Sequence, residues 1–302
     1  MLNNKIKMSI KKLIIPAALV FFASCDYVDL PTPSGNTPID TTTGNTTHRK
    51  VLVEEVTGHF CPTCPAGAAT LEAAKAIYGD SMIVVAIHTG YFAQNVAQFG
   101  LPPGAPQGSY TEDFNTPEGF DWGNVFSMGG SAPRCMYNRT GFPAGLHDMH
   151  PNDCASVLDT ILDRPQSADF EVTHNYNAAT RALTLTANGN FLTAGGGSGD
   201  SYNIVVLLTE DSLLGWQKDG QSHIQNYVFN HVLRACVNTP GNVAGTNIHT
   251  GAVAAGDTIA YTLPSAYTLP ASVNEDHADL VVFVYNAVTK EVLQVEKIAV
   301  KE

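Results

Sequence analysis

The stretch VLVEEVTGHFCPTCP, residues 51–65, places two cysteines three positions apart directly after an apolar run. The apolar run is typical of a buried strand, and the Ala-, Leu- and Ile-rich segment at 62–79 has the spacing of a helix that ends at Gly79. A second apolar run at 81–88, rich in β-branched residues, predicts a strand buried on both faces. Strand, helix and strand in this order predict a right-handed crossover between parallel strands.

Cys61 and Cys64 are the strongest candidates for chemistry. If Cys61 caps the helix and Pro62 is its first residue, the Cys61 sulfur lies at the positive end of the helix dipole, which favours the thiolate. Cys64, one turn further on, is then placed to resolve a mixed disulfide. Two alternatives stay open, an idle structural disulfide and a metal site. With His59 the pair supplies only three of the four ligands of a structural zinc, so we predict no metal and no other cofactor.

Three features around this pair resemble the thioredoxin superfamily: the strand–CxxC–helix order, Glu55 six residues before Cys61, and Pro133 at the start of a later strand. The resemblance implies that Glu55 carries protons to and from the resolving thiol. It also implies that Pro133, in a cis peptide bond, shapes the peptide-binding groove. The sequence departs from the superfamily at Phe60, where Trp is usual, and at Pro65, where a basic residue is frequent.

The pattern of apolar and polar residues changes at Pro165. Before it, a Gly-, Pro- and aromatic-rich segment at 90–130 reads as an insertion. After it, apolar and polar residues alternate with period two in seven runs separated by Gly, Asn, Asp and Pro, which is typical of a β-sandwich. The runs are 168–177, 181–189, 202–211, 226–237, 257–264, 279–287 and 291–300. We therefore predict an α/β thioredoxin-like domain with a four- or five-stranded sheet at 49–165, followed by an all-β sandwich at 166–302.

Three further cysteines follow the CxxC pair. Cys135 lies in a predicted strand at 131–139, and Cys154 lies in a predicted helix at 152–164 that packs nearby. In an exported protein disulfides are permitted, and we predict a structural disulfide between these two. Cys236 is then left as a buried free thiol.

The N-terminus indicates export and anchoring. Four lysines precede a short apolar run, and the run ends in FFASC, which resembles the lipobox of bacterial lipoproteins. We predict a signal peptide at 1–24, acyl chains such as palmitate on Cys25, and a flexible Thr- and Pro-rich spacer at 25–48. The alternative is an ordinary cleaved signal. Asp26 and Asp29 resemble signals that send lipoproteins to the outer leaflet, so we predict a lipid-anchored outer-membrane protein facing the periplasm or the cell surface.

The net charge of the chain limits the kinds of partner that it can bind. The formal net charge of −12 makes nucleic acid an implausible partner. The predicted partners are the membrane, through the lipid on Cys25, and the thiols or disulfides of exported proteins.

A finer resemblance covers nearly the whole chain. The lipobox, the spacer and the segments EEVTGHFCPTCPAG, RCMYNRTGFP and NYVFNHVLRACV are similar to the twenty-eight-kilodalton outer-membrane-protein-related family, thioredoxin-like lipoproteins with a following β-sandwich. The resemblance implies an anchored protein that exchanges thiols and disulfides on exported proteins. The alternative is a non-catalytic surface or periplasmic binding lipoprotein, in which the sandwich carries recognition and the CxxC pair is a structural disulfide.

Overall fold

The computed structural model describes residues 48–301. The predicted signal peptide at 1–24, the lipid site at Cys25 and all but the last residue of the predicted spacer at 25–48 lie outside the described residues. Between residues 48 and 301, none of the helices is long and apolar enough to cross a membrane.

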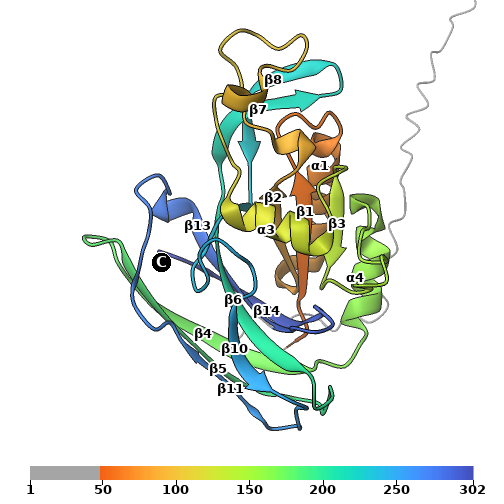
Figure 1. The fold of residues 1–302 in the computed structure, drawn as a ribbon, viewed down its shortest axis with the longest axis vertical. Helices are drawn as coiled ribbons and strands as arrows, with labels where there is room; N and C mark the ends of the chain where they lie inside the picture. The colour runs from red at the N-terminus through yellow and green to blue at the C-terminus, as the bar shows by residue number, and fades with distance from the viewer. Residues whose placement is uncertain (1–47, 302) are drawn as a thin grey trace, which may run out of the picture. The chain divides into compact units, whose positions relative to one another are not determined.

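The first elements form the predicted strand–helix–strand unit (Figure 1). Strand β1 (Val51–Thr57) pairs in parallel with β2 (Met82–His88), and helix α1 (Cys64–Tyr78) connects them. Strand β3 (Arg134–Tyr137) pairs antiparallel with the other edge of β1. Both faces of β1 and β2 are buried, which explains why their sequences are apolar without alternation.

Helices cover the two faces of this sheet. Helices α1 and α4 (Cys154–Leu162) pack on one face, in a core that includes Val53, Leu71 and Leu158. Helix α3 (Pro117–Phe126) packs on the other through Trp122 and Phe126. The N-terminal region is therefore a mixed α/β structure with the cysteine pair next to α1.

The remaining elements are mostly strands. They are α2 (Val96–Phe99), β4 (Ala168–Asn177), β5 (Ala182–Phe191), β6 (Ser201–Glu210), β7 (Leu213–Asp219), β8 (Ser222–Phe229), β9 (Val232–Cys236), β10 (Thr246–Thr250), β11 (Thr258–Thr262), β12 (Tyr267–Thr268), β13 (Ala278–Asn286) and β14 (Val292–Ala299). Four short 3-10 helices complete the elements of the described part of the chain.

One sheet of eight strands runs through both regions, in the order β14-β13-β6-β9-β2-β1-β3, with β10 also paired to β6. The expected four- or five-stranded sheet within 49–165 is wrong, because that segment supplies only β1, β2 and β3. Strand β9 pairs in parallel with β2 and covers its free edge, and an unpaired edge would leave backbone groups of a buried strand unsatisfied. The boundary at 165/166 stays a prediction.

A second sheet of four strands, β4, β5, β11 and β12, packs on β6 and β13 of the first (Figure 1). Alternate residues of β6 divide between two cores: Ile204 and Val206 face the second sheet, while Val205 and Leu207 face the core that contains α3. The region after residue 165 is therefore β-rich and layered, and its first layer is shared with the N-terminal region.

The strand predicted at 226–237 is in fact two strands. The chain breaks at His231, which adopts a left-handed conformation with φ 58° between β8 and β9. Strand β8 turns away to pair with β7, and the two form a separate hairpin.

A buried ion pair connects three parts of the core. The Arg139 guanidinium donates to both carboxylate oxygens of Glu54, at 2.8 and 2.7 Å, and the Trp122 indole donates to the same carboxylate at 2.8 Å. The guanidinium also lies over the rings of Phe283 and Tyr285 on β13. Both charged side chains are almost fully buried, so each depends on the other for compensation.

Candidate functional site

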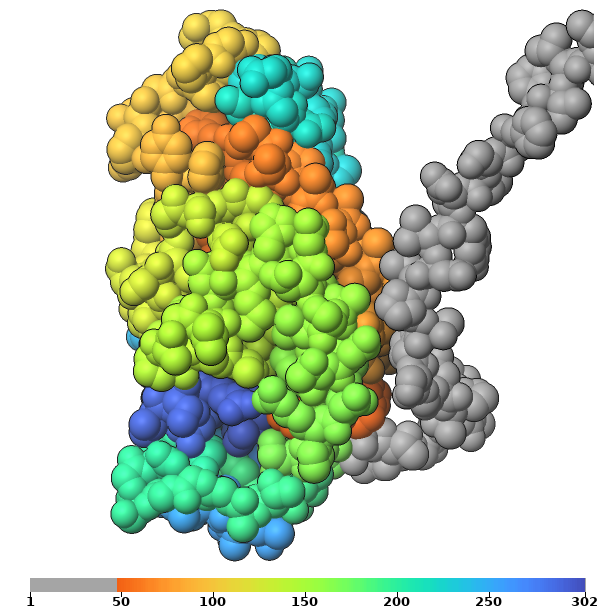
Figure 2. Space-filling model, turned by 90° about the vertical axis from the view of Figure 1, so that its right-hand side faces the viewer, coloured from red at the N-terminus to blue at the C-terminus, as the bar shows by residue number. Residues whose placement is uncertain are grey.

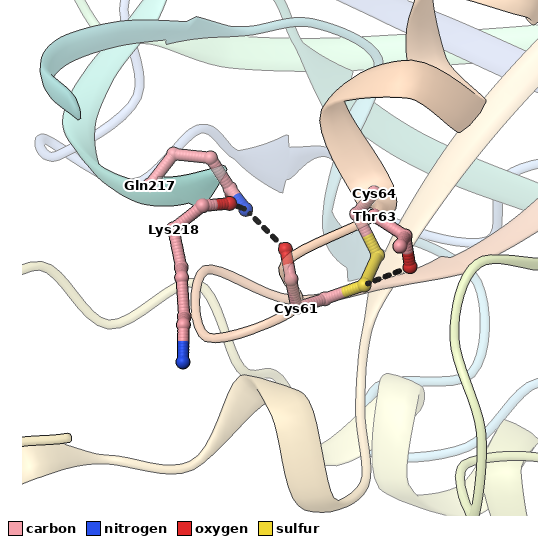
Figure 3. The surroundings of a disulfide bond; sticks show 5 residues. All are labelled: Cys61, Thr63, Cys64, Gln217 and Lys218. Atoms are coloured by element: carbon pink, nitrogen blue, oxygen red, sulfur yellow. Dashed lines mark hydrogen bonds between the residues drawn. A yellow bond between two sulfur atoms is a disulfide. The ribbon is translucent and has the colours of Figure 1, made fainter. Parts of the chain in front are cut away.

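Cys61 and Cys64 form a disulfide at the start of α1, with their Cα atoms 5.4 Å apart (Figure 3). The expected helix cap at Cys61 is wrong: the helix begins at Cys64, and Thr63 is its N-cap. The reason is local, because the Gly67 amide donates to the Thr63 carbonyl, while the Cys61 amide donates back to Gly58 in a turn before the helix. Both sulfurs still lie at the N-terminal end of α1, where the dipole favours negative charge.

The disulfide is covered. Cys61 is 0 % exposed and Cys64 is 2 % exposed, which contradicts the expectation of an exposed attacking thiol at Cys61. The Cys61 sulfur lies 3.7 Å from the Thr63 hydroxyl (Figure 3). Its burial results from two segments that pack over the CxxC loop.

The first covering segment is the β7–β8 hairpin. Three of its groups donate hydrogen bonds to three carbonyls of the CxxC loop, and Figure 3 shows the one to Cys61. The bonds run from Lys218 N to His59 O (2.8 Å), from Gln217 Nε2 to Cys61 O (2.9 Å) and from Gly220 N to Pro62 O (2.8 Å). The hairpin is thus attached to the CxxC loop by backbone and side chain together.

The second covering segment is the insertion between β2 and α3. The Phe60 amide donates to the Phe92 carbonyl at 2.9 Å, and the Tyr110 ring packs edge-on against Phe60 with centroids 5.0 Å apart. The Tyr110 hydroxyl lies 2.6 Å from Nδ1 of His223 on β8. In Figure 2 this insertion, in yellow, lies beside the hairpin and next to α1.

A cavity of about 290 Å³ lies between α1 and the hairpin and reaches the disulfide from the side of Cys64. Glu55 and Cys64 both line it, and the Glu55 side chain is 4 % exposed. Among the described residues, Oε1 of Glu55 has no hydrogen-bond partner. Burial raises the pKa of Glu55 to about 8, with Glu72 acting in the same direction and His231 opposing it. At neutral pH the carboxyl therefore holds a proton beside the disulfide.

His88 lines the same cavity at the end of β2. Burial lowers its pKa to about 3, and the nearby His59 and Arg234 add to the effect. Its ring packs edge-on against Phe114 and Phe229, and within residues 48–301 neither ring nitrogen has a hydrogen-bond partner. The His88 ring is therefore uncharged at neutral pH.

Pro133 lies against the first turns of α1. The Ala132–Pro133 peptide bond is cis. A Cβ built on Gly67 would come within 2.8 Å of the Pro133 ring, so the glycine allows the helix to approach it closely. The structure thus brings Pro133 to the helix that begins at Cys64, while Glu55 meets that helix from the strand side.

The predicted disulfide between Cys135 and Cys154 is wrong. The structure has both as buried free thiols, and the Tyr137 hydroxyl donates to the His150 carbonyl at 3.2 Å. Burial raises the pKa of Cys154 to about 11 and raises that of Cys135 as well, so both are protonated and unreactive at neutral pH. Cys236 is also a buried free thiol, as expected, and lies 3.2 Å from the Thr239 hydroxyl.

Sequence reasoning missed a cluster of charged side chains at the base of the hairpin. His231 Nε2 lies 3.1 Å from Glu72 and 3.1 Å from the Lys75 ammonium, both on α1, and its Nδ1 lies 3.0 Å from Asp211. Burial opposes the charged ring, but the bonds to Asp211 and Glu72 raise the pKa of His231 above its ordinary value. These contacts join residues far apart in the chain, and no local pattern marks them.

The hairpin itself was also missed, although it carries a local signal. Gly220 and Gln221 form the two-residue turn between the paired residues Asp219 and Ser222, and a glycine at the first of the two turn positions favours such a hairpin. Gly220 adopts φ 56°, as such a turn requires.

Comparisons with known proteins bear on the fold and the family. The model of the family described as "Outer membrane protein Omp28" matches residues 130–302, more than half of the chain. The structure of HBP35 of Porphyromonas gingivalis matches with a TM-score of 0.61 and 13 % identity, covering 85 % of this chain and 76 % of that one. At this identity the likeness shows a shared fold.

Two further solved structures are similar to parts of this chain. A domain of the outer membrane lipoprotein Omp28 from Porphyromonas gingivalis is 22 % identical, covers 46 % of this chain and 93 % of that one, and has a TM-score of 0.28. A protein from Agrobacterium tumefaciens is 15 % identical over 85 % of this chain and 96 % of that one, with a TM-score of 0.47. No curated protein sequence matches this chain. Because the family match covers residues 130–302, this chain belongs to the Omp28 family of outer membrane proteins.

Proposed function

We propose that this protein is a lipid-anchored outer-membrane protein whose thioredoxin-like region exchanges thiols and disulfides with exported proteins. One observation carries the proposal: the Cys61–Cys64 disulfide lies at the N-terminal end of α1 and shares a cavity with the protonated carboxyl of Glu55. Disulfide exchange needs a leaving thiolate that is stabilised and then protonated. The helix end and Glu55 supply these two functions.

The proposed exchange takes place in two steps. A thiolate of the exported protein attacks Sγ of Cys61, the Cys61–Cys64 bond breaks, and Cys64 leaves as a thiolate that takes the proton of Glu55. A second thiolate of the same partner then attacks its own sulfur in the mixed disulfide, and Cys61 leaves as a thiolate. The partner loses two electrons and gains a disulfide, while this protein gains two thiols. Glu55 recovers its proton from water that enters through the cavity.

The proposed anchor is acyl lipid on Cys25. Membership of an outer-membrane protein family supports the location, and a related Omp28 domain comes from a protein described as a lipoprotein. Two or three acyl chains hold a protein stably at a bilayer. The spacer at 25–48 then lets the folded region reach partners away from the membrane, in the periplasm or at the cell surface.

A second function is favoured by the burial of both sulfurs. An attacking thiolate must reach a sulfur along the line of the breaking bond, and Cys61 is 0 % exposed. In this alternative the CxxC pair is a structural disulfide, and the protein is a binding lipoprotein that uses its β-sandwich for recognition.

The redox equilibrium of the mature protein separates the two functions. The protein is incubated with graded ratios of reduced and oxidised glutathione, and its thiols are counted by alkylation and mass spectrometry. Exchange predicts that the pair equilibrates at a potential above about −300 mV and that the protein oxidises a reduced dithiol peptide. A pair that stays oxidised throughout, with no peptide oxidised, would support the structural alternative. The matched control is Cys61→Ser, which removes the pair.

A further inference from the structure

The β7–β8 hairpin is joined to the rest of the fold mainly at its two ends. It forms a sheet of only two strands, separate from both larger sheets. One side lies on the CxxC loop, and the other side exposes Leu214 (58 %) and Val228 (48 %), which face each other across the two strands. An isolated two-stranded hairpin is marginally stable in water, so its position depends on the contacts that it makes.

The tip of the hairpin makes the contacts that cover the disulfide. The three hydrogen bonds from Gln217, Lys218 and Gly220 all end on carbonyls of the CxxC loop. Lys218 donates from strand β7 and Gly220 donates from the turn after it, both through the backbone amide. These three donors therefore occupy the acceptors that another extended polypeptide would use at this place.

The base of the hairpin is built differently. Asp211 precedes β7 and His231 follows β8, and the His231 amide donates to the Asp211 carboxylate at 2.5 Å. The His231 ring contacts Glu72 of α1, so the base is tied to the helix. Ser212 (φ 62°) and His231 (φ 58°) both hold left-handed conformations, which residues other than glycine rarely adopt. Ser212 and His231 therefore set the angle at which the β7–β8 hairpin leaves the main sheet.

We infer that the β7–β8 hairpin is an internal cover that occupies the face at which an extended polypeptide partner meets Cys61, and that the disulfide reacts only when the tip lifts about Ser212 and His231. The partner that fits is a strand-like segment with a cysteine, whose N–H groups replace those of Lys218 and Gly220 on the same carbonyls. The claim that the hairpin selects partners rests on the proposed function. The claim that the hairpin limits access to the disulfide does not depend on it.

The rate of chemical reduction tests the cover without any partner. Tris(2-carboxyethyl)phosphine attacks the disulfide and ends as the phosphine oxide with oxygen from water, while the two sulfurs take up two electrons and two protons. The reduction of the mature protein is followed by quenched alkylation and mass spectrometry. The variants are Gln217→Met, which keeps the length of the side chain but removes its donor, and Lys218→Pro, which removes the backbone donor.

We expect each variant to be reduced three- to tenfold faster than the unaltered protein. Tenfold corresponds to about 1.4 kcal/mol, which is within the net contribution of one hydrogen bond. Leu214→Ser, on the exposed side of the hairpin, is the matched control and should be reduced at the original rate. Backbone hydrogen exchange at Lys218 and Gly220 should accelerate in Gln217→Met by a factor similar to that of reduction.

Equal reduction rates for the unaltered protein, Gln217→Met and Leu214→Ser would overturn the inference, as would faster reduction with no change in exchange at the hairpin tip. If Lys218→Pro fails to fold, Gln217→Met alone decides, because it leaves the backbone intact. The proposed function is tested by a different result. If the variants are reduced faster but neither they nor the original protein oxidises a dithiol peptide, the inference about the hairpin holds and the proposed function is wrong.

Discussion

Replacing Glu55 by Gln should make the protein more stable, and increasingly so as pH rises. Burial raises the pKa of Glu55 to about 8 from an ordinary value of 4.5. Above pH 4.5 the unfolded chain ionises this carboxyl while the folded protein keeps it protonated, so the unfolded state binds fewer protons and stability falls with pH. The loss continues until the folded carboxyl also ionises near pH 8.

The size of this effect follows from the two pKa values. Each unit between them is worth about 1.4 kcal/mol. Glu55 therefore removes roughly 3 to 4 kcal/mol of folding free energy between about pH 5 and about pH 8. Gln has nearly the shape of the protonated acid and no charge to desolvate, so a Glu55→Gln variant should lack this loss.

Urea denaturation with the disulfide intact measures the difference. The free energy of unfolding of the original protein and of Glu55→Gln is compared at about pH 5, 6.5 and 8. The difference in unfolding free energy between Glu55→Gln and the original protein should widen with pH. Glu171 is an exposed carboxyl on β4, so for Glu171→Gln the corresponding difference should stay constant. A constant gap for Glu55→Gln, or a variant that is less stable at pH 8, would refute the assignment of a protonated Glu55. If the proposed function holds, the same variant should also oxidise a dithiol peptide more slowly.

Three further substitutions test the core, the thiols and the anchor. Arg139→Met should cost about 3 to 5 kcal/mol by leaving Glu54 charged, buried and unpaired, and Glu54→Gln combined with it should recover part of that loss in urea denaturation. Cys64→Ser should trap a mixed disulfide with oxidised glutathione at Cys61, whereas Cys61→Ser should trap much less; equal trapping would contradict distinct roles for the two thiols. Cys25→Ser should move the protein out of the membrane fraction and abolish lipid labelling, and an unchanged distribution would contradict the anchor.

The first strand–helix–strand unit was predictable because its signals are local. An apolar run, a helical spacing and a second apolar run are each contained within one short segment, and the structure reproduces their order and parallel pairing. The approach of Pro133 to α1 has no local signal in the sequence, and only the thioredoxin resemblance pointed to Pro133. The start of the helix was misplaced by two residues because Pro62 is also compatible with a turn, and the turn closed by Gly58 and Cys61 forms instead.

The covering of the disulfide was not predictable from local signals. One of the two segments that bury Cys61 contacts the CxxC loop through Gln217, Lys218 and Gly220, more than 150 positions later in the chain. Their donors are backbone amides or a common polar side chain, so composition does not distinguish them from any solvated hairpin. The prediction of a Cys135–Cys154 disulfide failed in a related way: the strand and the helix do share a core, but nearness of two elements does not bring two particular sulfurs within bonding distance.

The position of the cover follows from the topology of the main sheet. Strands β1 and β2 are parallel, so their carboxyl ends meet at one edge, and the CxxC loop leaves β1 at that edge. Strand β9 is parallel to β2 and begins opposite Ala86, near the same edge. Any segment inserted directly before β9 must therefore emerge beside the CxxC loop, and the β7–β8 hairpin is that segment. A strand of the β-rich C-terminal region that joins the sheet next to β2 thus brings the β7–β8 hairpin to the disulfide.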